Sequence, residues 1–455
     1  MNTLAVKKAT ASSPFVPCLV CLVALLFLRD FAEVPIPSFL FLCLTGIVAV
    51  LAEKTEVIAF CFCCIPALNA FQTKYALWMC IIIYIIRFKP RKFVISPMVP
   101  ILFLALWELA HGFLDVASPI EELRLFTELC FCCFVMMLSP EELDFQKIIR
   151  SMSAVATGVC IIILLSQLKQ SGYQMSALFS GVFRLGYGVD ETKMSVGFNP
   201  NYLSYMCLCC MEGLACLIYR NQQKVSDIFC IVVLSIIGLL TMSKKFILCA
   251  AAFVFLFAVC RKKKIRTLLG IALVLVAVWL IFKQGFPTAY EALLERFEYG
   301  DLSTGRGDIF AYFHEQLAQD SGLLFFGVGL QDYRHKLLVR YMSSIPHNGF
   351  QELLVMWGIP GLIAFVIFLW LMVRRAKCLN PHIRLINYVP FIIMLLNVQV
   401  TQMASSSLVC ALIAVVYLCM VSDLRPETEI AREKMGAGAA TGANFGTVGV
   451  QHVGE

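Results

Sequence analysis

The sequence contains few charged residues. Only 15% of its 455 residues are Asp, Glu, Lys or Arg, whereas 60% are hydrophobic. Soluble domains average about a quarter charged residues and about half apolar ones, so a soluble domain could not bury the apolar surface of this chain. The net charge is +7, but no basic segment outside the hydrophobic runs is interleaved with aromatic residues, which argues against nucleic-acid binding.

Several short motifs are also missing. The sequence has no Gly-x-x-x-x-Gly-Lys-Ser/Thr loop, which argues against ATP-driven transport. It has no Asp-x-Asp pair, which argues against a metal-dependent transferase that uses a sugar nucleotide. It also lacks His-Glu-x-x-His and Gly-x-Ser-x-Gly, the motifs of zinc proteases and serine hydrolases. We therefore expect no metal and no cofactor.

Hydrophobic runs recur from one end of the chain to the other. Most have the length of about 15–25 residues that a helix needs to cross a bilayer. They predict an all-α, polytopic integral membrane protein with about 12–14 transmembrane helices. The runs cover roughly residues 15–29, 36–52, 56–71, 74–88, 95–114, 123–139, 148–168, 199–219, 226–241, 244–260, 265–283, 346–373, 384–401 and 403–422.

The Lys and Arg residues predict the orientation of these helices. If residues 1–14 form a cytoplasmic N-terminal segment, the positively charged loops all fall on the cytoplasmic side, as the positive-inside rule requires. The net charge then reflects membrane topology. These positions are Lys7 and Lys8, Lys54, Arg87–Lys92, Lys147 and Arg150, Arg220 and Lys224, Arg261–Arg266, and Arg374, Arg375 and Lys377.

Residues 15–422 read as one polytopic membrane domain, interrupted on its outer side by two polar segments. The shorter covers about 169–198 and the longer, a large outer loop, about 284–345. A tail at 423–455 is polar and rich in Ala and Gly, which predicts a disordered cytoplasmic segment.

The large outer loop contains two stretches with helical spacing of apolar residues. They are Ala289–Phe297 and Ile309–Leu317, separated by a break rich in Gly, Ser and Thr. Gly327-Val-Gly329 predicts a turn. We expect short amphipathic helices that lie on the outer membrane surface and close over a cavity.

The chain has 21 cysteines, and none lies in a predicted outer loop. Three Cys-x-Cys-Cys runs have ligand-like spacing, but they lie in apolar helices with no nearby His. We interpret them as small apolar core residues, and we assign no metal site. The runs are Cys61, Cys63 and Cys64; Cys130, Cys132 and Cys133; and Cys207, Cys209 and Cys210.

Cationic residues from distant parts of the sequence fall at or near the predicted outer membrane boundary. Such a cluster suits the anionic head of a lipid, and Arg can bind a phosphate with two parallel hydrogen bonds. Each residue taken alone is also explained as a charge that snorkels from a helix end, and for Arg124 and Lys245 both interpretations stay open. The residues are Arg124, Arg184, Lys244, Lys245, Arg306 and His347.

The large outer loop runs into a hydrophobic helix through His347-Asn348, and Gly358-Ile-Pro-Gly361 follows after nine residues. A neutral imidazole can accept or hold the proton of an attacking hydroxyl group. A lone His at this place would more commonly be an interfacial or capping residue. The two glycines permit close helix packing, and Pro360 predicts a bend.

This His-Asn pair, spacer and Gly-x-x-Gly together resemble the signature of the O-antigen ligase and polymerase superfamily. Its members are membrane glycosyltransferases that move glycans off a polyprenyl diphosphate carrier. The turn Ser303-Thr-Gly-Arg306-Gly-Asp308 is similar to the superfamily's Gly-Arg turn. Arg184 and Gly186, followed by Asn199-Pro200-Asn201, resemble a second segment, although Asn201 could simply cap a helix.

Thr241-Met-Ser243-Lys244-Lys245 resembles a third segment, in which relatives carry Ser-Arg. Lys keeps the charge of Arg but not its bidentate geometry. The resemblance covers about residues 184–372, which we take as the ligase-like core of the membrane domain.

The resemblance implies a metal-independent, inverting glycosyltransferase in surface polysaccharide biosynthesis, such as that of lipopolysaccharide or exopolysaccharide. The donor would be an undecaprenyl-diphosphate-linked saccharide in the bacterial cytoplasmic (inner) membrane, met at the outer face. The acceptor would be a glycan, lipid A–core or a protein hydroxyl. His347 and Arg306 would be catalytic. The groups that would bind the diphosphate are Arg184, Lys244, Lys245 and Arg306, with Asn348, Gly358 and Gly361 supporting the motif.

Two other classes of function fit the same sequence. A transporter or flippase would hold lipid-linked glycans in the same cationic cavity without cleaving a bond, and a scaffold in a glycan-assembly complex would make the His347 pattern a coincidence. Intramembrane Glu108, His111, Glu128 and Glu212 could line the cavity, form structural ion pairs, or relay protons in a transporter.

Overall fold

The computed structural model describes residues 13–422 apart from internal gaps, and it contains sixteen helices and no strand in the described residues. The gaps are 69, 91–93, 113–121, 140–141, 171, 174–184, 187–198, 262–263, 286, 288–289, 292–293, 296–305, 331–347, 381–382 and 400–406. Several predicted features therefore lie outside the described residues. They are Arg184, the expected helix start at Ala289, His347 and the expected tail at 423–455.

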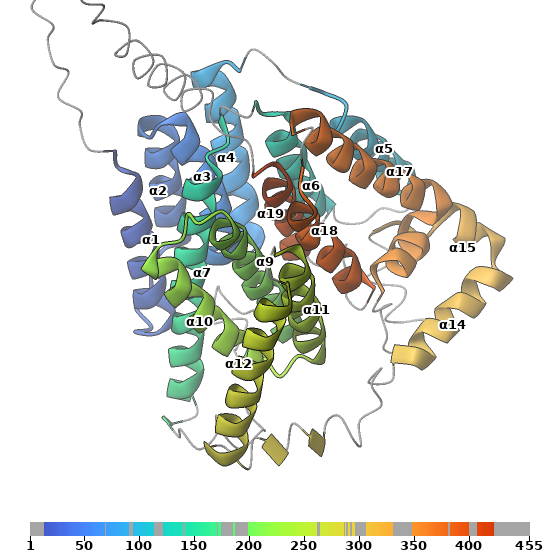
Figure 1. Cartoon of the computed structure of the whole chain (residues 1–455). Helices are drawn as coiled ribbons and strands as arrows, with labels where there is room; N and C mark the ends of the chain where they lie inside the picture. The colour runs from blue at the N-terminus through green and yellow to red at the C-terminus, as the bar shows by residue number, and fades with distance from the viewer. Residues whose placement is uncertain are drawn as a thin grey trace, which may run out of the picture.

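The helices follow the predicted hydrophobic runs closely. Figure 1 shows how they are arranged in space. They are α1 Phe15–Asp30, α2 Ser38–Leu51, α3 Lys54–Ala67, α4 Ala70–Phe88, α5 Met98–Gly112, α6 Glu122–Met137, α7 Phe145–Gln170, α9 Pro200–Tyr219, α10 Val225–Leu240, α11 Lys244–Cys260, α12 Lys264–Gly285, α14 Arg306–Gln319, α15 Ser321–Phe326, α17 Gly349–Leu379, α18 Leu385–Val398 and α19 Ser407–Val421.

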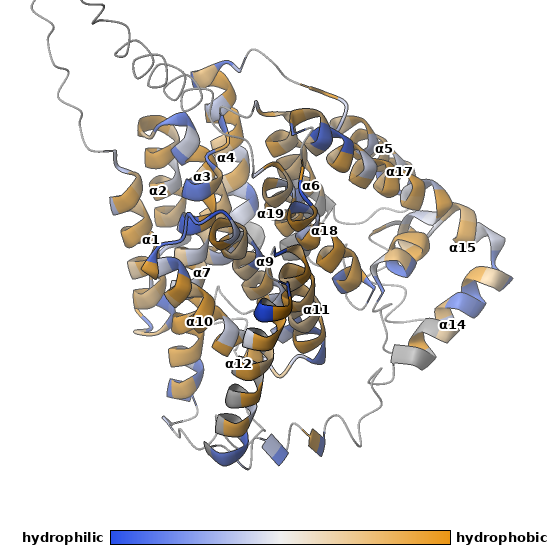
Figure 2. Ribbon diagram, in the orientation of Figure 1, coloured by the Kyte–Doolittle hydropathy of each residue, from blue (hydrophilic) through white to orange (hydrophobic). Residues whose placement is uncertain are grey.

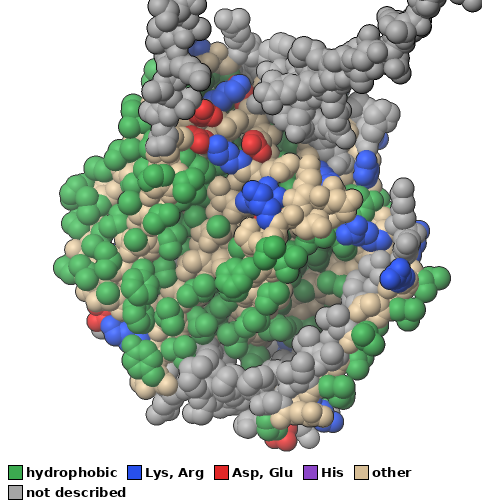
Figure 3. Space-filling model, turned by 60° about the vertical axis from the view of Figure 1, so that its left-hand side comes forward, with side chains coloured by type: hydrophobic (Ala, Val, Ile, Leu, Met, Phe, Trp, Pro, Cys, Tyr) green, Lys and Arg blue, Asp and Glu red, His purple; other side chains and the backbone are tan. Residues whose placement is uncertain are grey.

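The prediction of an all-α, polytopic membrane protein is confirmed. Within the described residues, α7, α9 and α17 are long and apolar enough to cross a membrane, and six further apolar helices are shorter. Hydrophobic residues cover most of the helical ribbon (Figure 2). A broad hydrophobic surface occupies the middle of the view in Figure 3, and most of its Lys and Arg side chains lie above or beside it.

The centre of the bundle is formed by α9 and α19, which pack against each other. Almost every residue of α9 from Leu203 to Leu217, and of α19 from Cys410, is buried. A helix that is apolar on all sides belongs inside a protein. The Cys-x-Cys-Cys runs on α3, α6 and α9 are almost entirely buried as free thiols, as the prediction of small apolar core residues requires.

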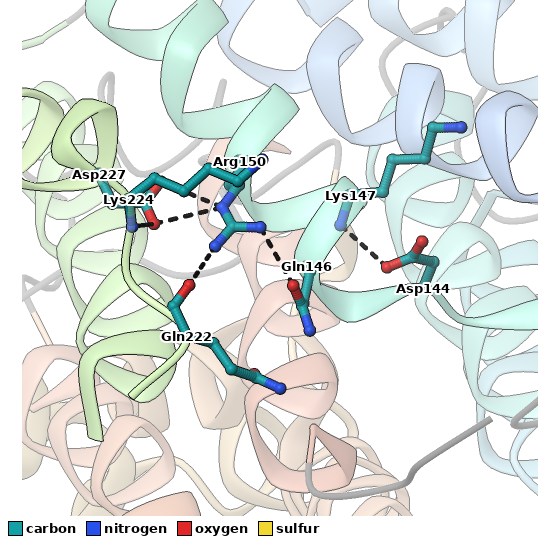
Figure 4. Close-up of polar contacts among 7 residues, drawn as sticks. All are labelled: Asp144, Gln146, Lys147, Arg150, Gln222, Lys224 and Asp227. Atoms are coloured by element: carbon teal, nitrogen blue, oxygen red, sulfur yellow. Dashed lines mark hydrogen bonds and ion pairs between the residues drawn. The ribbon is translucent and has the colours of Figure 1, made fainter. Parts of the chain in front are cut away.

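A polar network joins the start of α7 to the loop between α9 and α10 (Figure 4). The Arg150 guanidinium donates to both carboxylate oxygens of Asp227 at 3.2 Å and to Gln146 Oε1 at 3.1 Å, and it also donates to the Gln222 carbonyl. Asp227 in turn accepts from the Lys224 backbone N–H at 2.8 Å. The C-terminal end of α9 therefore lies beside the start of α7, and we call this the basic end of the bundle because Lys147, Arg150 and Lys224 lie here.

Helix α17 is broken at Gly358, whose φ of 65° and ψ of −164° are not helical. The expectation that Pro360 bends this helix needs correction, because the break lies two residues earlier and Pro360 belongs to the first turn of the second half. Pro suits that place, since the first N–H groups of a helix have no partner within it. The first half, Gly349–Trp357, is thus a separate short rod.

The break in α17 packs against the segment that follows α15. A Cβ added at Gly358 would lie 2.4 Å from the Phe325 carbonyl oxygen, and one added at Gly327 would lie 2.4 Å from the Met356 carbonyl oxygen. The Val328 N–H donates to the Val355 carbonyl at 3.0 Å. Two backbones can approach this closely only where side chains are missing, which confirms the expected role of Gly358 in packing.

We predict that Gly358→Ala destabilises the protein by at least about 1–3 kcal/mol, the cost of a backbone conformation that is essentially restricted to glycine, before the clash with Phe325 is added. Gly270→Ala is the matched control. Gly270 lies in α12 with no atom within 4 Å of an added Cβ, so a gain of about 0.5–1 kcal/mol is expected. Thermal unfolding in detergent compares the two, and an unchanged melting temperature for Gly358→Ala would contradict the packing described.

Candidate functional site

The N-terminal ends of α9 and α11 lie side by side and are joined by side chains. The Asn199 Oδ1 atom caps α9 by accepting from the Asn201 N–H at 2.9 Å. Ser243 Oγ caps α11 by accepting from the Phe246 N–H at 3.4 Å, and it donates to Asn201 Oδ1 at 3.1 Å. The second and third segments predicted from the sequence therefore meet in space. Asn201 links the helices here, and Asn199, not Asn201, is the cap of α9.

The second segment is also attached at its other end. The Leu185 N–H donates to the Leu240 carbonyl at 3.0 Å, and the Gly186 N–H donates to Gln167 Oε1 at 3.0 Å. Leu240 ends α10, only a few residues before Lys244. The neighbour of Arg184 in the chain thus lies beside the turn that leads into α11, although Arg184 itself is outside the described residues.

Lys244 and Lys245 occupy the first turn of α11, where Lys244 is partly exposed and Lys245 is 7% exposed. The N-terminus of a helix carries partial positive charge and favours anions. The positive charges of Lys244 and Lys245 are unfavourable at this end of the helix dipole, so they do not stabilise α11. Cations beside a positive helix end attract negatively charged groups.

Asn348 connects α17 to α18. Its Oδ1 caps α17 by accepting from the N–H groups of Phe350 and Gln351 at 3.0 and 3.1 Å, and its Nδ2 donates to Gln399 Oε1 at 3.1 Å. The cap fixes which side of the Asn348 amide is oxygen, so the outward atom must be the donor. Because α18 packs against α11 and α9, the start of α17 is tied to the same group of helices as Lys244.

The remaining predicted site residues are only partly described. Arg306 is the first residue of α14, and the expected helix at Ile309–Leu317 is confirmed within α14. The side chains of Arg306 and Arg124 lie outside the described residues. Gly361 lies in the second half of α17, where an added Cβ would be 2.1 Å from Trp357 Cβ. Gly361 therefore leaves room for the Trp357 side chain.

Sequence reasoning missed Gln399. This exposed residue ends α18 and belongs to no motif in the sequence. A polar amide at the outer end of a predicted span was the only available signal. Glu128 and Glu212, which were considered for the cavity, are each 1% exposed in the packed helices, so the structure gives them core positions.

A family model described as "O-Antigen ligase" matches residues 229–366. The match covers less than a third of the chain and includes α10, α11, α12, α14, α15 and the broken part of α17. It confirms the resemblance to the O-antigen ligase and polymerase superfamily that His347-Asn348 and Gly358–Gly361 carry. No curated protein matches the chain.

We predict that Asn348→Ala destabilises the protein more than Asn348→Ser, by about 0.5–2 kcal/mol, because Ser still caps α17 and Ala does not. Gln399→Ala is the matched variant: like Asn348→Ser it removes the bond between α17 and α18 and leaves the cap in place. Denaturation of the three variants should group Asn348→Ser with Gln399→Ala. If Ser were as damaging as Ala, the cap would contribute nothing.

Proposed function

We propose that this protein transfers or polymerises glycan from an undecaprenyl-diphosphate carrier at the outer face of the cytoplasmic membrane. The O-antigen ligase match over residues 229–366 is the observation that carries the proposal. The joined N-termini of α9 and α11, with two cations in the first turn of α11, support it because they suit an anionic diphosphate.

The position of these helix ends supports action at the outer face. Arg150 ties the C-terminal end of α9 to the basic end of the bundle, and basic loops lie in the cytoplasm in most membrane proteins. The N-terminal end of α9 is 20 residues away, which is about 30 Å of helix and about one hydrocarbon thickness. Asn201, Ser243 and Lys244 are then on the side opposite the cytoplasm.

The proposed reaction is a single displacement at the anomeric carbon. The acceptor hydroxyl oxygen forms the new glycosidic bond, its proton passes to His347, and the old bond breaks with its electron pair leaving on the diphosphate oxygen. Attack opposite the leaving group inverts the configuration. Arg184, Lys244, Lys245 and Arg306 hold the diphosphate and stabilise the charge that develops on it. These protein cations stabilise the charge of the leaving diphosphate, as a metal ion does in metal-dependent transferases.

One assay separates the candidate functions. Purified protein is incubated with an undecaprenyl-diphosphate-linked repeat unit from its own host and no other acceptor, and the glycans are separated on a gel. A ladder of longer products identifies a polymerase, because the donor alone then supplies both partners. Product only after addition of lipid A–core or a protein acceptor identifies a ligase. An unchanged donor with every acceptor, together with its movement across vesicle membranes, would identify a transporter and overturn the proposal.

We predict that His347→Ala lowers transfer by about 10²–10⁴-fold, the usual contribution of a general base, with unchanged protein level. The matched control is His314→Ala, since His314 is an exposed histidine on α14 within the same outer segment. It should keep wild-type activity. Full transfer activity of His347→Ala would remove His347 from the reaction.

We predict a graded loss at Arg306. Removing one donor from a charge-stabilising site costs about 10²–10³-fold in kcat, so Arg306→Gln should fall in that range. Arg306→Lys should retain part of the activity because it keeps the charge without bidentate contact. Arg374→Lys, which changes an exposed arginine near the other end of α17, is the control. Equal activity of Arg306→Lys and wild type would show that bidentate contact is not used.

A further inference from the structure

Glu108 of α5 is 3% exposed and accepts hydrogen bonds from two segments more than 200 positions away in the sequence. The Leu330 backbone N–H donates to both carboxylate oxygens, at 2.9 and 3.1 Å, and the Trp357 indole Nε1–H donates to Oε2 at 2.5 Å. Leu330 lies near the end of the described part of the outer loop, and Trp357 ends the first half of α17. One buried carboxylate therefore holds both segments.

The residues on either side of Glu108 strengthen this contact. The Trp107 indole N–H donates to the Trp357 carbonyl at 3.1 Å, and the Trp107 ring stacks on Phe326 with centroids 6.2 Å apart. His111 Nε2 lies 2.9 Å from the Phe326 carbonyl. A turn of α5 thus contacts the end of α15 and the break in α17 at the same time.

The fit between these segments leaves no room for side chains. Gly329, at φ 77°, lies against α5, where an added Cβ would be 3.0 Å from His111 Cβ and 3.5 Å from Glu108 Oε1. Gly327 and Gly358 make the reciprocal backbone contact between the outer loop and α17. Small movements of α17 or of residues 326–330 therefore have to break bonds to Glu108.

We propose that Glu108 is a positioning residue for the transfer reaction: it holds the break in α17 and residues 326–330 in one fixed arrangement, and so fixes the rod Gly349–Trp357. This rod begins directly after His347-Asn348. At 1.5 Å per residue it is roughly 13 Å long, short and rigid enough that the placement of its C-terminal end sets the placement of its start. The proposal rests on the proposed function, because His347 is the group being placed.

The variant Glu108→Gln tests the proposal with little change in shape. The Gln side chain has one acceptor oxygen, so even with this oxygen in the place of Oε2 the Leu330 N–H loses its bond to Oε1 and meets an NH₂ group there. The bonds that remain also lose the charge of the carboxylate, which makes them weaker. The expected result is a fall in kcat of about tenfold or more, with the KM for the lipid-linked donor changed less than about twofold, because misplacement affects the reacting geometry and not the diphosphate site. Leu109→Ala, at a 53% exposed neighbour on α5, should match wild type.

Two further measurements separate positioning from a general loss of fold. Trp357→Phe removes the indole N–H and keeps the apolar ring, and in that background Glu108→Gln should lower kcat by a smaller factor than it does alone. Hydrogen exchange of the segment 321–330, measured without donor, should be at least about tenfold faster in Glu108→Gln, while exchange in α9 stays at the wild-type rate.

The outcomes distinguish this proposal from the proposed function. A wild-type protein that transfers no glycan with any acceptor overturns the proposed function, while the exchange measurement still decides whether Glu108 holds the two segments. Unchanged exchange in Glu108→Gln, or a Glu108→Gln effect of equal size with and without the Trp357 indole N–H, overturns the positioning role. A rise in donor KM at constant kcat also overturns it, because Glu108 would then act on binding.

Discussion

The break in α17 has to satisfy its backbone groups without help from water. Inside a bilayer an unpaired N–H or carbonyl costs several kcal/mol, so irregular backbone is tolerated only where protein covers it. Here the carbonyls that lose their helical partners at Gly358 accept from the Val328 N–H and from the Trp107 indole. The partners come from the outer loop and from α5, and for this reason the break, the loop and α5 form one unit. Residues 326–330 are thereby fixed to α17, the helix that begins two residues after His347.

Charge placement and helix direction lead to the same site independently. The cations of the α11 first turn oppose the local helix dipole, and the N-terminus of α9 adds a second positive helix end beside them. An apo protein gains no stability from such an arrangement, whereas a diphosphate between the helix ends would interact with both dipoles and with the side chains. The polar network at the opposite end stabilises the protein by itself. There the negative charge of Asp227 lies at the positive start of α10, accepts from the Lys224 N–H and pairs with Arg150. The charges at that end are paired within the protein, whereas the charges at the end with Lys244 suit the anion of the proposed function.

The sequence predicted the helices and the family because both depend on local patterns. Apolar runs of bilayer length show where a helix lies, and the spacing from His347 to Gly361 needs no knowledge of distant segments. The contacts that these residues make with distant segments could not be predicted from such local patterns. Glu108 was recognised as an unusual intramembrane carboxylate, but its donors Leu330 and Trp357 are more than 200 positions away. Gln399 belongs to no motif. Pro360 indicated a bend, but the break lies at Gly358, where the backbone approaches Phe325 closely.

The structure explains the length of the nine-residue spacer between Asn348 and Gly358. It is the length of the rod between a capped helix start and a fixed break, and both ends are held by different neighbours: Gln399 at the start, and Glu108 with Trp107 at the break. Inserting one residue would rotate the start by about 100° relative to the break and move it by about 1.5 Å along the axis. Either Asn348 would lose Gln399 or Trp357 would lose Glu108. The spacing of the motif therefore follows from the two places where the rod is held, at Gln399 after α18 and at α5, whereas the proposed chemistry needs only His347.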